Sequence, residues 1–173
     1  MTDAPLSRTV EIALRPATPD DRPLLLRIYA STREQELAQV PFTPEQKAAF
    51  LEQQFAAQSA HYAQHHGDGS FDVVEVDGEP AGRLIVSRRP QELLIVDVAL
   101  LPQFRGGGIG TRLLAPVLAE ADGRGAKVTI HVEHLNPAQR LYRRLGFAPV
   151  AAEEQGIYQL WERPPGGGAP RPT

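Results

Sequence analysis

The segment PQFRGGGIGTRLL, Pro102–Leu114, concentrates glycine just before an apolar helical pattern. Its glycines fall within residues 106–110, at Gly106, Gly107, Gly108 and Gly110. Each glycine in regular structure costs about 0.5–1 kcal/mol relative to alanine, so a compensating role is expected. Backbone amides at a helix N-terminus lack intrahelical partners, and the helix dipole favours negative charge there. The segment therefore predicts a phosphate-binding turn.

Three phosphate-binding patterns compete for this turn. A P-loop ends in Gly-Lys-Ser/Thr, whereas Gly110 is followed directly by Thr111. A dinucleotide fingerprint starting at Gly106 needs glycine or alanine at position 111, and it opens the first βαβ unit of its fold. This stretch instead lies past the middle of the chain. The third pattern, Arg-x-x-Gly-x-Gly, is satisfied by Arg105, Gly108 and Gly110.

Apolar periodicity places the turn between a strand and a helix. The run ELLIVDVAL, Glu92–Leu100, is nearly continuously apolar, which predicts a central strand covered on both faces. After the turn, an apolar helical face is predicted, with Pro116 inside it as a source of a kink. That face consists of Leu113, Leu114, Val117, Leu118 and Ala121.

The remaining elements have equally local signals. Val10–Arg15 alternates as a strand, and Asp77-Gly78 between β-rich runs predicts a type I′ hairpin. Helix starts are predicted at Thr18 and at Thr43, where Gln46 completes a capping box. A strand in AKVTIHVE, a short helix from Asn136 to Gly146 and a last strand at Gly156–Arg163 follow. The order predicts an α/β (α+β) domain with a mixed sheet.

Composition bounds the function. The chain has 173 residues, 42% of them apolar and 23% charged, with net charge −3 and no cysteine. We expect one domain over residues 1–163 and a flexible Pro/Gly-rich tail over residues 164–173. The charge gives no reason to expect nucleic acid or a membrane as partner, and no signal peptide or span is visible, so a cytoplasmic location is expected. A homodimer is left open.

A histidine run, HYAQHH, is the one metal-like pattern. His61 and His65 are spaced i, i+4, and Asp68 is the nearest acidic residue. Histidine is also favourable at a helix C-terminus without any metal. We therefore expect no metal site.

The glycine turn in its setting resembles the Gcn5-related N-acetyltransferase (GNAT) family. The strand and turn DVALLPQFRGGGIG match one family segment, and NPAQRLYRRLGF matches a second; together they span Leu93–Phe147. The resemblance implies the acyl-CoA N-acyltransferase fold over Val10–Arg163. That fold is a mixed, mostly antiparallel sheet of about six to seven strands flanked by about four helices.

The resemblance also implies the co-substrate acetyl-CoA and its binding residues. Backbone groups of Val98, Ala99 and Leu100 would bind the pantetheine arm, and Arg105 would add charge to the turn or brace it. The pyrophosphate would lie on the amides of Gly106, Gly107, Gly108, Ile109, Gly110 and Thr111.

The family chemistry is direct transfer of acetyl to an amine. Tyr142 matches the family tyrosine that protonates the leaving thiolate, and Asn136 is expected to contact the cofactor. Many members have one residue more between these two positions. The base is open between Asp97, a carboxylate in an apolar strand, and His131, five positions before Asn136; some members rely on water alone.

The acceptor is not identified by the sequence. Glu34 and Glu36, in REQEL between the first two helices, lie where the family builds its acceptor site and would hold an amine. A small amine, an amino acid, an antibiotic or a protein N-terminus all fit. Two other functions are weighed: an inactive acyl-CoA-binding sensor of the same fold, and a nucleotide- or phosphate-binding domain of different chemistry.

Overall fold

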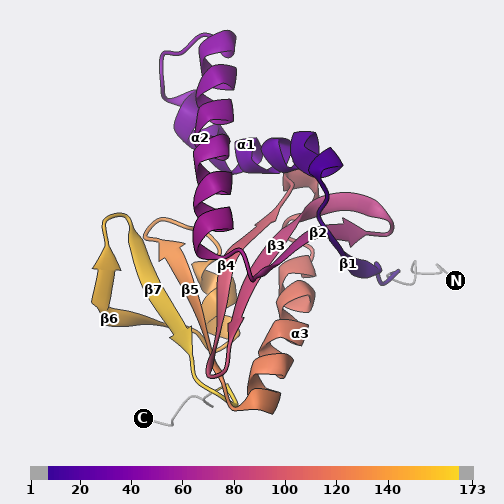
Figure 1. The fold of residues 1–173 in the computed structure, drawn as a ribbon, viewed down its shortest axis with the longest axis vertical. Helices are drawn as coiled ribbons and strands as arrows, with labels where there is room; N and C mark the ends of the chain where they lie inside the picture. The colour runs from indigo at the N-terminus through magenta and orange to yellow at the C-terminus, as the bar shows by residue number, and fades with distance from the viewer. Residues whose placement is uncertain (1–7, 168–173) are drawn as a thin grey trace, which may run out of the picture.

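The computed structural model describes residues 8–167, and for residues 151–155 it describes the backbone alone. Within that range the chain forms a seven-stranded sheet and four α-helices (Figure 1). In chain order these are β1 (Ile12–Pro16), α1 (Arg22–Ala38), α2 (Pro44–His65), β2 (Ser70–Val76), β3 (Glu79–Arg89), β4 (Glu92–Leu100), α3 (Ile109–Arg124), β5 (Lys127–Glu133), α4 (Gln139–Arg144), β6 (Ala148–Gln155) and β7 (Tyr158–Arg163), with 3₁₀ turns at Pro19–Asp21 and Pro102–Phe104.

The strand order is β1-β2-β3-β4-β5-β7-β6. Among the described residues, β4 and β5 pair in parallel and the other neighbours pair antiparallel. The connection between the two parallel strands runs through the glycine turn and α3. This arrangement confirms the predicted mixed, mostly antiparallel sheet and places β4 at its centre.

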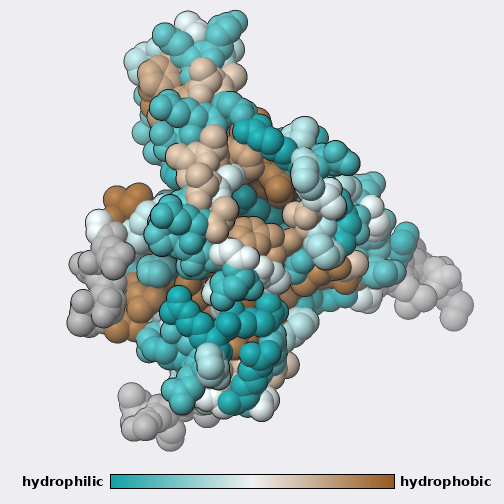
Figure 2. Space-filling model, viewed as in Figure 1, coloured by the Kyte–Doolittle hydropathy of each residue, from teal (hydrophilic) through white to brown (hydrophobic). Residues whose placement is uncertain are grey.

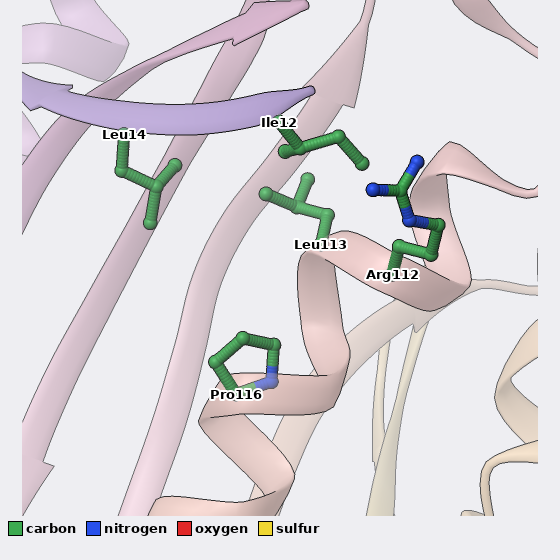
Figure 3. Close-up of a pocket in the computed structure, with 5 residues that line it drawn as sticks. All are labelled: Ile12, Leu14, Arg112, Leu113 and Pro116. Atoms are coloured by element: carbon green, nitrogen blue, oxygen red, sulfur yellow. The ribbon is translucent and has the colours of Figure 1, made fainter. Parts of the chain in front are cut away.

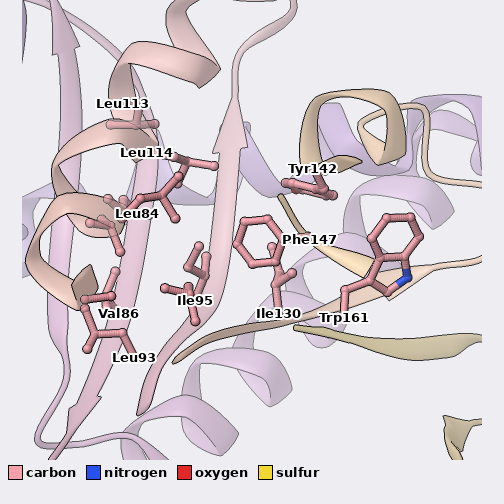
Figure 4. Packing of buried hydrophobic residues seen from close by; sticks show 14 of the residues in the cluster. Leu84, Val86, Leu93, Ile95, Leu113, Leu114, Ile130, Tyr142, Phe147 and Trp161 are labelled. Atoms are coloured by element: carbon pink, nitrogen blue, oxygen red, sulfur yellow. The ribbon is translucent and has the colours of Figure 1, made fainter. Parts of the chain in front are cut away.

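The main core lies between α3 and the sheet. The predicted apolar face of α3 is buried in full, and side chains of β3, β4 and β5 meet it. Figure 4 shows Tyr142 and Phe147 extending this cluster toward Trp161. Burying an aliphatic or aromatic side chain contributes about 1.5–3 kcal/mol, so this face fixes α3, and with it the glycine turn, against β4.

Strands β4 and β5 pair over their first halves only. Their register ends at Ile95 opposite Ile130. Val96 has no partner on β3, so β4 forms a β-bulge there, directly after Ile95. Beyond it, β4 follows β3 to Leu100 while β5 follows β7 to Glu133. The two strands therefore diverge, and Figure 1 shows the opening directed toward α1 and α2.

Two local predictions are confirmed in geometry. Asp77 and Gly78 have φ of 50° and 79°, as a type I′ turn requires. At the start of α2, the Gln46 amide donates to Thr43 Oγ1 (3.2 Å), and the Thr43 amide donates to Gln46 Oε1 (2.9 Å). The capping box thus fixes where α2 begins.

Some boundaries differ from the sequence predictions. β1 begins at Ile12, and α4 begins at Gln139 rather than directly after Asn136. Asn136 Oδ1 accepts the Ala138 amide (2.8 Å), so its side chain closes a turn before the helix instead of capping the helix. β6 was not predicted, because APVAAEEQ lacks both alternation and β-rich residues. Of the predicted tail, residues 168–173 lie outside the described residues.

Candidate active site

The glycine turn presents a row of free amides. The backbone N–H groups of residues 106–111 donate to no other group within residues 8–167. Gly106 and Gly108 have φ of 81° and 77°, in the left-handed region that favours glycine. A Cβ on Gly106, Gly107 or Gly108 would meet nothing within 4 Å. These amides stand at the N-terminus of α3 in open space, which is the geometry that binds a phosphate.

Arg105 braces this turn. Its Nε donates to the Leu100 carbonyl (2.8 Å), and its Nη2 donates to Ser31 Oγ of α1 (3.3 Å). Arg105 was predicted to add charge to the turn or to brace it. These hydrogen bonds brace the turn by tying it to the end of β4 and to α1. Gly110 differs from the other glycines, because a Cβ there would lie 3.0 Å from Leu141 Cδ2, so it lets α3 approach α4 closely.

The end of β4 offers an unpaired strand edge. Val98, Ala99 and Leu100 pair with β3 on one side, and their other side faces the opening toward β5. The side chains of Val98 and Leu100 pack against the main core. Backbone can therefore bind a ligand here while side chains hold the strand. The 3₁₀ turn Pro102–Phe104 separates this edge from the glycine turn.

Asp97 and Tyr142 lie close enough for charge to couple them. Tyr142 is 4% exposed and packs edge-on against Phe147, with ring centroids 6.0 Å apart. Burial raises the pKa of Tyr142 to about 12, and the negative charge of Asp97 adds to the shift. The pKa of Tyr62 in α2 is also raised, first by burial and then by Asp97. The charge of Asp97 thus contributes to the raised pKa of two phenols, one on α4 and one on α2.

A buried arginine accompanies Asp97. Arg83 of β3 is 5% exposed and its Nε donates to Asp97 Oδ2 (2.6 Å). Its Nη2 also contacts Asp97 and donates to Gln58 Oε1 of α2 (2.6 Å). Sequence reasoning missed Arg83, although a cation inside the apolar run AGRLIVS is a detectable signal. It missed Tyr62 as well, for which the sequence has no local signal.

The other proton-transfer candidate stands apart from this group. His131 of β5 is exposed, and its side chain makes no hydrogen bond, ion pair or ring contact with another described residue. It lies opposite Leu160 of β7. Among the described residues the structure therefore couples Asp97, and not His131, to Tyr142.

The segment REQEL was predicted to lie between the first two helices, but it belongs to the last turns of α1, because that helix continues to Ala38. Its predicted acceptor residues lie at the surface. Glu34 and Glu36 are exposed, and Glu36 Oε2 is 2.9 Å from Arg33 Nη1. Arg33 reaches across to Glu133 of β5, with Nη1 4.0 Å from Glu133 Oε1. The pKa of Tyr158 is raised by burial and by Glu133. Arg33, Glu133 and Tyr158 thus form a polar cluster spanning α1, β5 and β7, which sequence reasoning did not find.

Two other features lie outside the candidate site. A cavity of about 330 Å³ between β1 and α3 is lined by aliphatic groups and Arg112 (Figure 3). The rings of His61 and His65 stack at 4.2 Å. Within residues 8–167, no group of three or more His, Cys, Asp or Glu side chains is placed to hold a metal ion.

The face seen in Figure 2 is mostly polar. Figure 2 shows hydrophilic residues over most of the viewed face and a small apolar patch at the tip of the β6–β7 hairpin, where Ile157 is exposed. No helix of the described chain is both long and apolar enough to cross a membrane.

Comparison with known proteins gives one consistent family. The model of the acetyltransferase (GNAT) family matches residues 27–147. Streptothricin acetyltransferase of Streptomyces lavendulae is 40% identical over 94 residues, 52% of this chain and 49% of that protein. Mycothiol acetyltransferase of Thermobifida fusca is 37% identical over 90 residues, 50% of this chain and 28% of that protein. The chain thus spans less than half the length of these curated relatives.

Solved structures share the fold. The PaiA N-acetyltransferase from Thermoplasma acidophilum, solved with coenzyme A, superposes with a TM-score of 0.67 at 16% identity and covers 89% of this chain and 99% of that chain. A putative phosphinothricin N-acetyltransferase superposes with a TM-score of 0.60 at 23% identity, over 90% of this chain and 99% of that chain. At these identities the likeness concerns the fold.

Proposed function

Because the chain belongs to the acetyltransferase (GNAT) family, we propose that it transfers the acetyl group of acetyl-CoA directly to a primary amine. One observation carries the proposal. The free amides of residues 106–111 follow the unpaired edge of β4 after one 3₁₀ turn, and that edge contains Asp97, whose charge adds to the raised pKa of Tyr142. A diphosphate site, a strand edge for an amide-containing arm and a proton-transfer pair thus follow one another along one opening.

The residues present suit coenzyme A. The free amides at the start of α3 would hold its diphosphate, and the turn has room for it because no atom lies within 4 Å of a Cβ on Gly106, Gly107 or Gly108. The open backbone edge of Val98–Leu100 would bind the amides of the pantetheine arm. Acetyl-CoA, when bound, supplies a thioester whose C–S bond breaks as the new amide bond forms.

Tyr142 is the proposed acid. With a pKa of about 12 it keeps its proton throughout the neutral range, so it can donate to a departing thiolate whose parent thiol has an ordinary pKa of about 8.5. The raised pKa makes complete transfer less favourable, so the hydroxyl acts largely by hydrogen bonding as negative charge develops on sulfur.

Asp97 is the proposed base. It is a partly exposed carboxylate on the open edge of β4, on the same strand as the proposed pantetheine contacts. A carboxylate there can take a proton from the acceptor ammonium directly or through one water. His131 remains the alternative base. Asn136 remains a predicted contact of the cofactor, and Glu34 and Glu36 remain predicted contacts of the acceptor.

The acceptor is proposed as a small-molecule amine. Two relatives are named for small molecules, as streptothricin acetyltransferase and mycothiol acetyltransferase. The polar cluster of Arg33, Glu133 and Tyr158 offers charged groups of both signs for such an acceptor. A peptide N-terminus is the second acceptor class retained from the sequence. The cytoplasmic location and a homodimer stay predictions.

A panel of amines assayed for release of the CoA thiol tests the proposal. We expect thiol release that depends on both acetyl-CoA and one class of amine, with equal amounts of acetylated amine by mass spectrometry. Binding of acetyl-CoA without thiol release against any amine would favour the inactive sensor. Stabilisation in a thermal-shift assay by ATP or NAD, and not by acetyl-CoA, would favour a domain of different chemistry.

A further inference from the structure

Arg83 is a buried cation that one face of α2 contacts. Phe55, Gln58 and Tyr62 of α2 are spaced i, i+3, i+7 and so lie on one helix face. The Arg83 guanidinium carbon lies 6.0 Å from the Phe55 ring centroid and 5.7 Å from that of Tyr62. Gln58 Oε1 accepts from Arg83 Nη2 between them (2.6 Å). The inner face of α2 therefore contacts one guanidinium through three side chains.

The guanidinium holds Asp97 by one oxygen only. Both Nε and Nη2 of Arg83 contact Oδ2 of Asp97. Oδ1 of Asp97 has no hydrogen-bond partner within residues 8–167. The Asp97 side chain is 21% exposed, whereas that of Arg83 is 7% exposed.

A second buried arginine shows the contrast. Arg163 is also buried, and it binds both oxygens of Asp122, through Nη1 at 2.8 Å and Nη2 at 3.1 Å. That two-oxygen fork is the stronger arrangement for an arginine–carboxylate pair. The pair of Arg83 and Asp97 lacks this fork, because both nitrogens contact Oδ2. Oδ1 of Asp97 is left without a partner, on the part of β4 that no longer pairs with β5.

We propose that Arg83 is a positioning residue for acetyl transfer. Arg83, itself fixed by α2, anchors Asp97 through Oδ2 and so presents Oδ1 to the acceptor amine. The inference rests on the proposed function, in which Asp97 takes the amine proton. It extends that function by making α2 the element that sets the orientation of the base.

The test compares Arg83→Met and Arg83→Lys with Arg163→Met as the matched control. Because misplacement of a catalytic group by about 1 Å can reduce rate about 100-fold, we expect kcat/KM for the amine to fall about 100-fold in Arg83→Met. We expect a loss of about tenfold in Arg83→Lys, since an ammonium keeps the charge without the fork. KM for acetyl-CoA should stay within about threefold in both. Arg163→Met should lower Tm and leave kcat/KM within about threefold, because the Arg163 side chain bonds Asp122 and the Leu145 carbonyl and neither Asp97 nor Tyr142.

A double variant separates positioning from folding. Arg83→Met combined with Asp97→Asn should be no slower than Asp97→Asn alone, because Arg83 then has no base to position. Multiplicative losses in the double variant would overturn the proposal, as would Arg83→Met with unchanged kcat/KM despite a lowered Tm.

A crystal structure of Arg83→Met, grown without amine, decides the matter independently of activity. We expect the Asp97 carboxylate to leave its wild-type orientation, and an unmoved carboxylate would overturn the proposal. Failure of the wild-type chain to release thiol with any amine contradicts the proposed function instead, and the position of Asp97 in the variant still settles the role of Arg83.

Discussion

Tyr142 holds its proton because of where it lies, and not because of any specific hydrogen bond. The phenol is buried beside Phe147, and the nearby Asp97 charge opposes a second negative charge. Both effects favour the neutral phenol and together raise its pKa to about 12. The same carboxylate raises the pKa of Tyr62 across the opening. Burial is the larger cause of both raised pKa values, and the Asp97 charge adds to it.

Replacement of Tyr142 by phenylalanine removes only the hydroxyl. We expect kcat to fall about 100-fold or more, as for loss of a general acid, while the Kd for acetyl-CoA measured by calorimetry stays within about threefold. The wild-type rate should show no decline attributable to Tyr142 below about pH 10, because its raised pKa keeps it protonated there. Equal turnover of the two proteins would remove Tyr142 from the reaction.

The choice of base is decided by comparing two variants. Asp97→Asn should lower kcat/KM by about 100-fold or more, because an amide cannot take the amine proton. His131→Ala should change kcat/KM by less than about threefold, because the His131 side chain contacts no described residue of the site. The reverse ranking would assign the base to His131, and little change in either variant would indicate catalysis through water alone.

Among the elements, the turn before α3 provides the most specific binding geometry. Its amides have no intrahelical partners because the helix begins at Ile109. The glycines before it have no side chains that could cover these amides, and the space beside them is open. Gly107 is the cleanest position to test, because its φ lies outside the left-handed region and a Cβ there meets open space. A side chain at Gly107 therefore adds charge and bulk without backbone strain.

Gly107→Glu should abolish measurable binding of acetyl-CoA by calorimetry, since a carboxylate would occupy the place of the diphosphate and repel it. Gly123→Glu is the matched control, because Gly123 lies near the other end of α3 and its Cβ also meets nothing within 4 Å. It should bind acetyl-CoA within about threefold of wild type. Undiminished binding in Gly107→Glu would refute the assigned diphosphate site.

Local signals predicted the elements well wherever a few residues determine the geometry. Asp77-Gly78 sets its hairpin through two positive φ values, and Thr43 with Gln46 sets the start of α2. The glycine turn and the apolar face of α3 were predicted for the same reason. β6 was missed because its strand forms by pairing with β7, a contact distant from its own residue preferences.

The site was predictable in part. Motif residues such as Gly108 and Tyr142 are recognised because their spacing is local. Arg83 and Tyr62 belong to the site through contacts between β3, β4 and α2, which no spacing in the sequence reports. The pairing of Asp97 with Arg83, and the isolation of His131, likewise depend on which strand faces which helix.

At the scale of the whole molecule, the ion pair between Arg163 and Asp122 ties the end of β7 to α3. Hydrogen bonding to Arg163 lowers the pKa of Asp122 below its ordinary value of 3.8. A lowered folded-state pKa contributes stability that is present above about pH 4 and is lost as pH falls through the folded-state pKa. The Gly166 amide also donates to Asp122 (2.8 Å), which fastens the chain just beyond β7.

Asp122→Asn should therefore lower Tm at pH 7, and the difference from wild type should shrink as pH falls below about 4. Thermal melts of both proteins over that pH range measure it. A Tm difference that persists unchanged to about pH 2 would show that the interaction does not depend on the Asp122 charge.

The divergence of β4 from β5 lets the sheet present a strand edge, a helix N-terminus and the proposed proton-transfer pair in one opening. A crystal structure of the protein with coenzyme A tests this account most directly. We predict the diphosphate on the amides of residues 106–111 and the pantetheine arm along Val98–Leu100, with its thiol end toward Asp97 and Tyr142. Coenzyme A bound elsewhere, with this opening empty, would contradict the account.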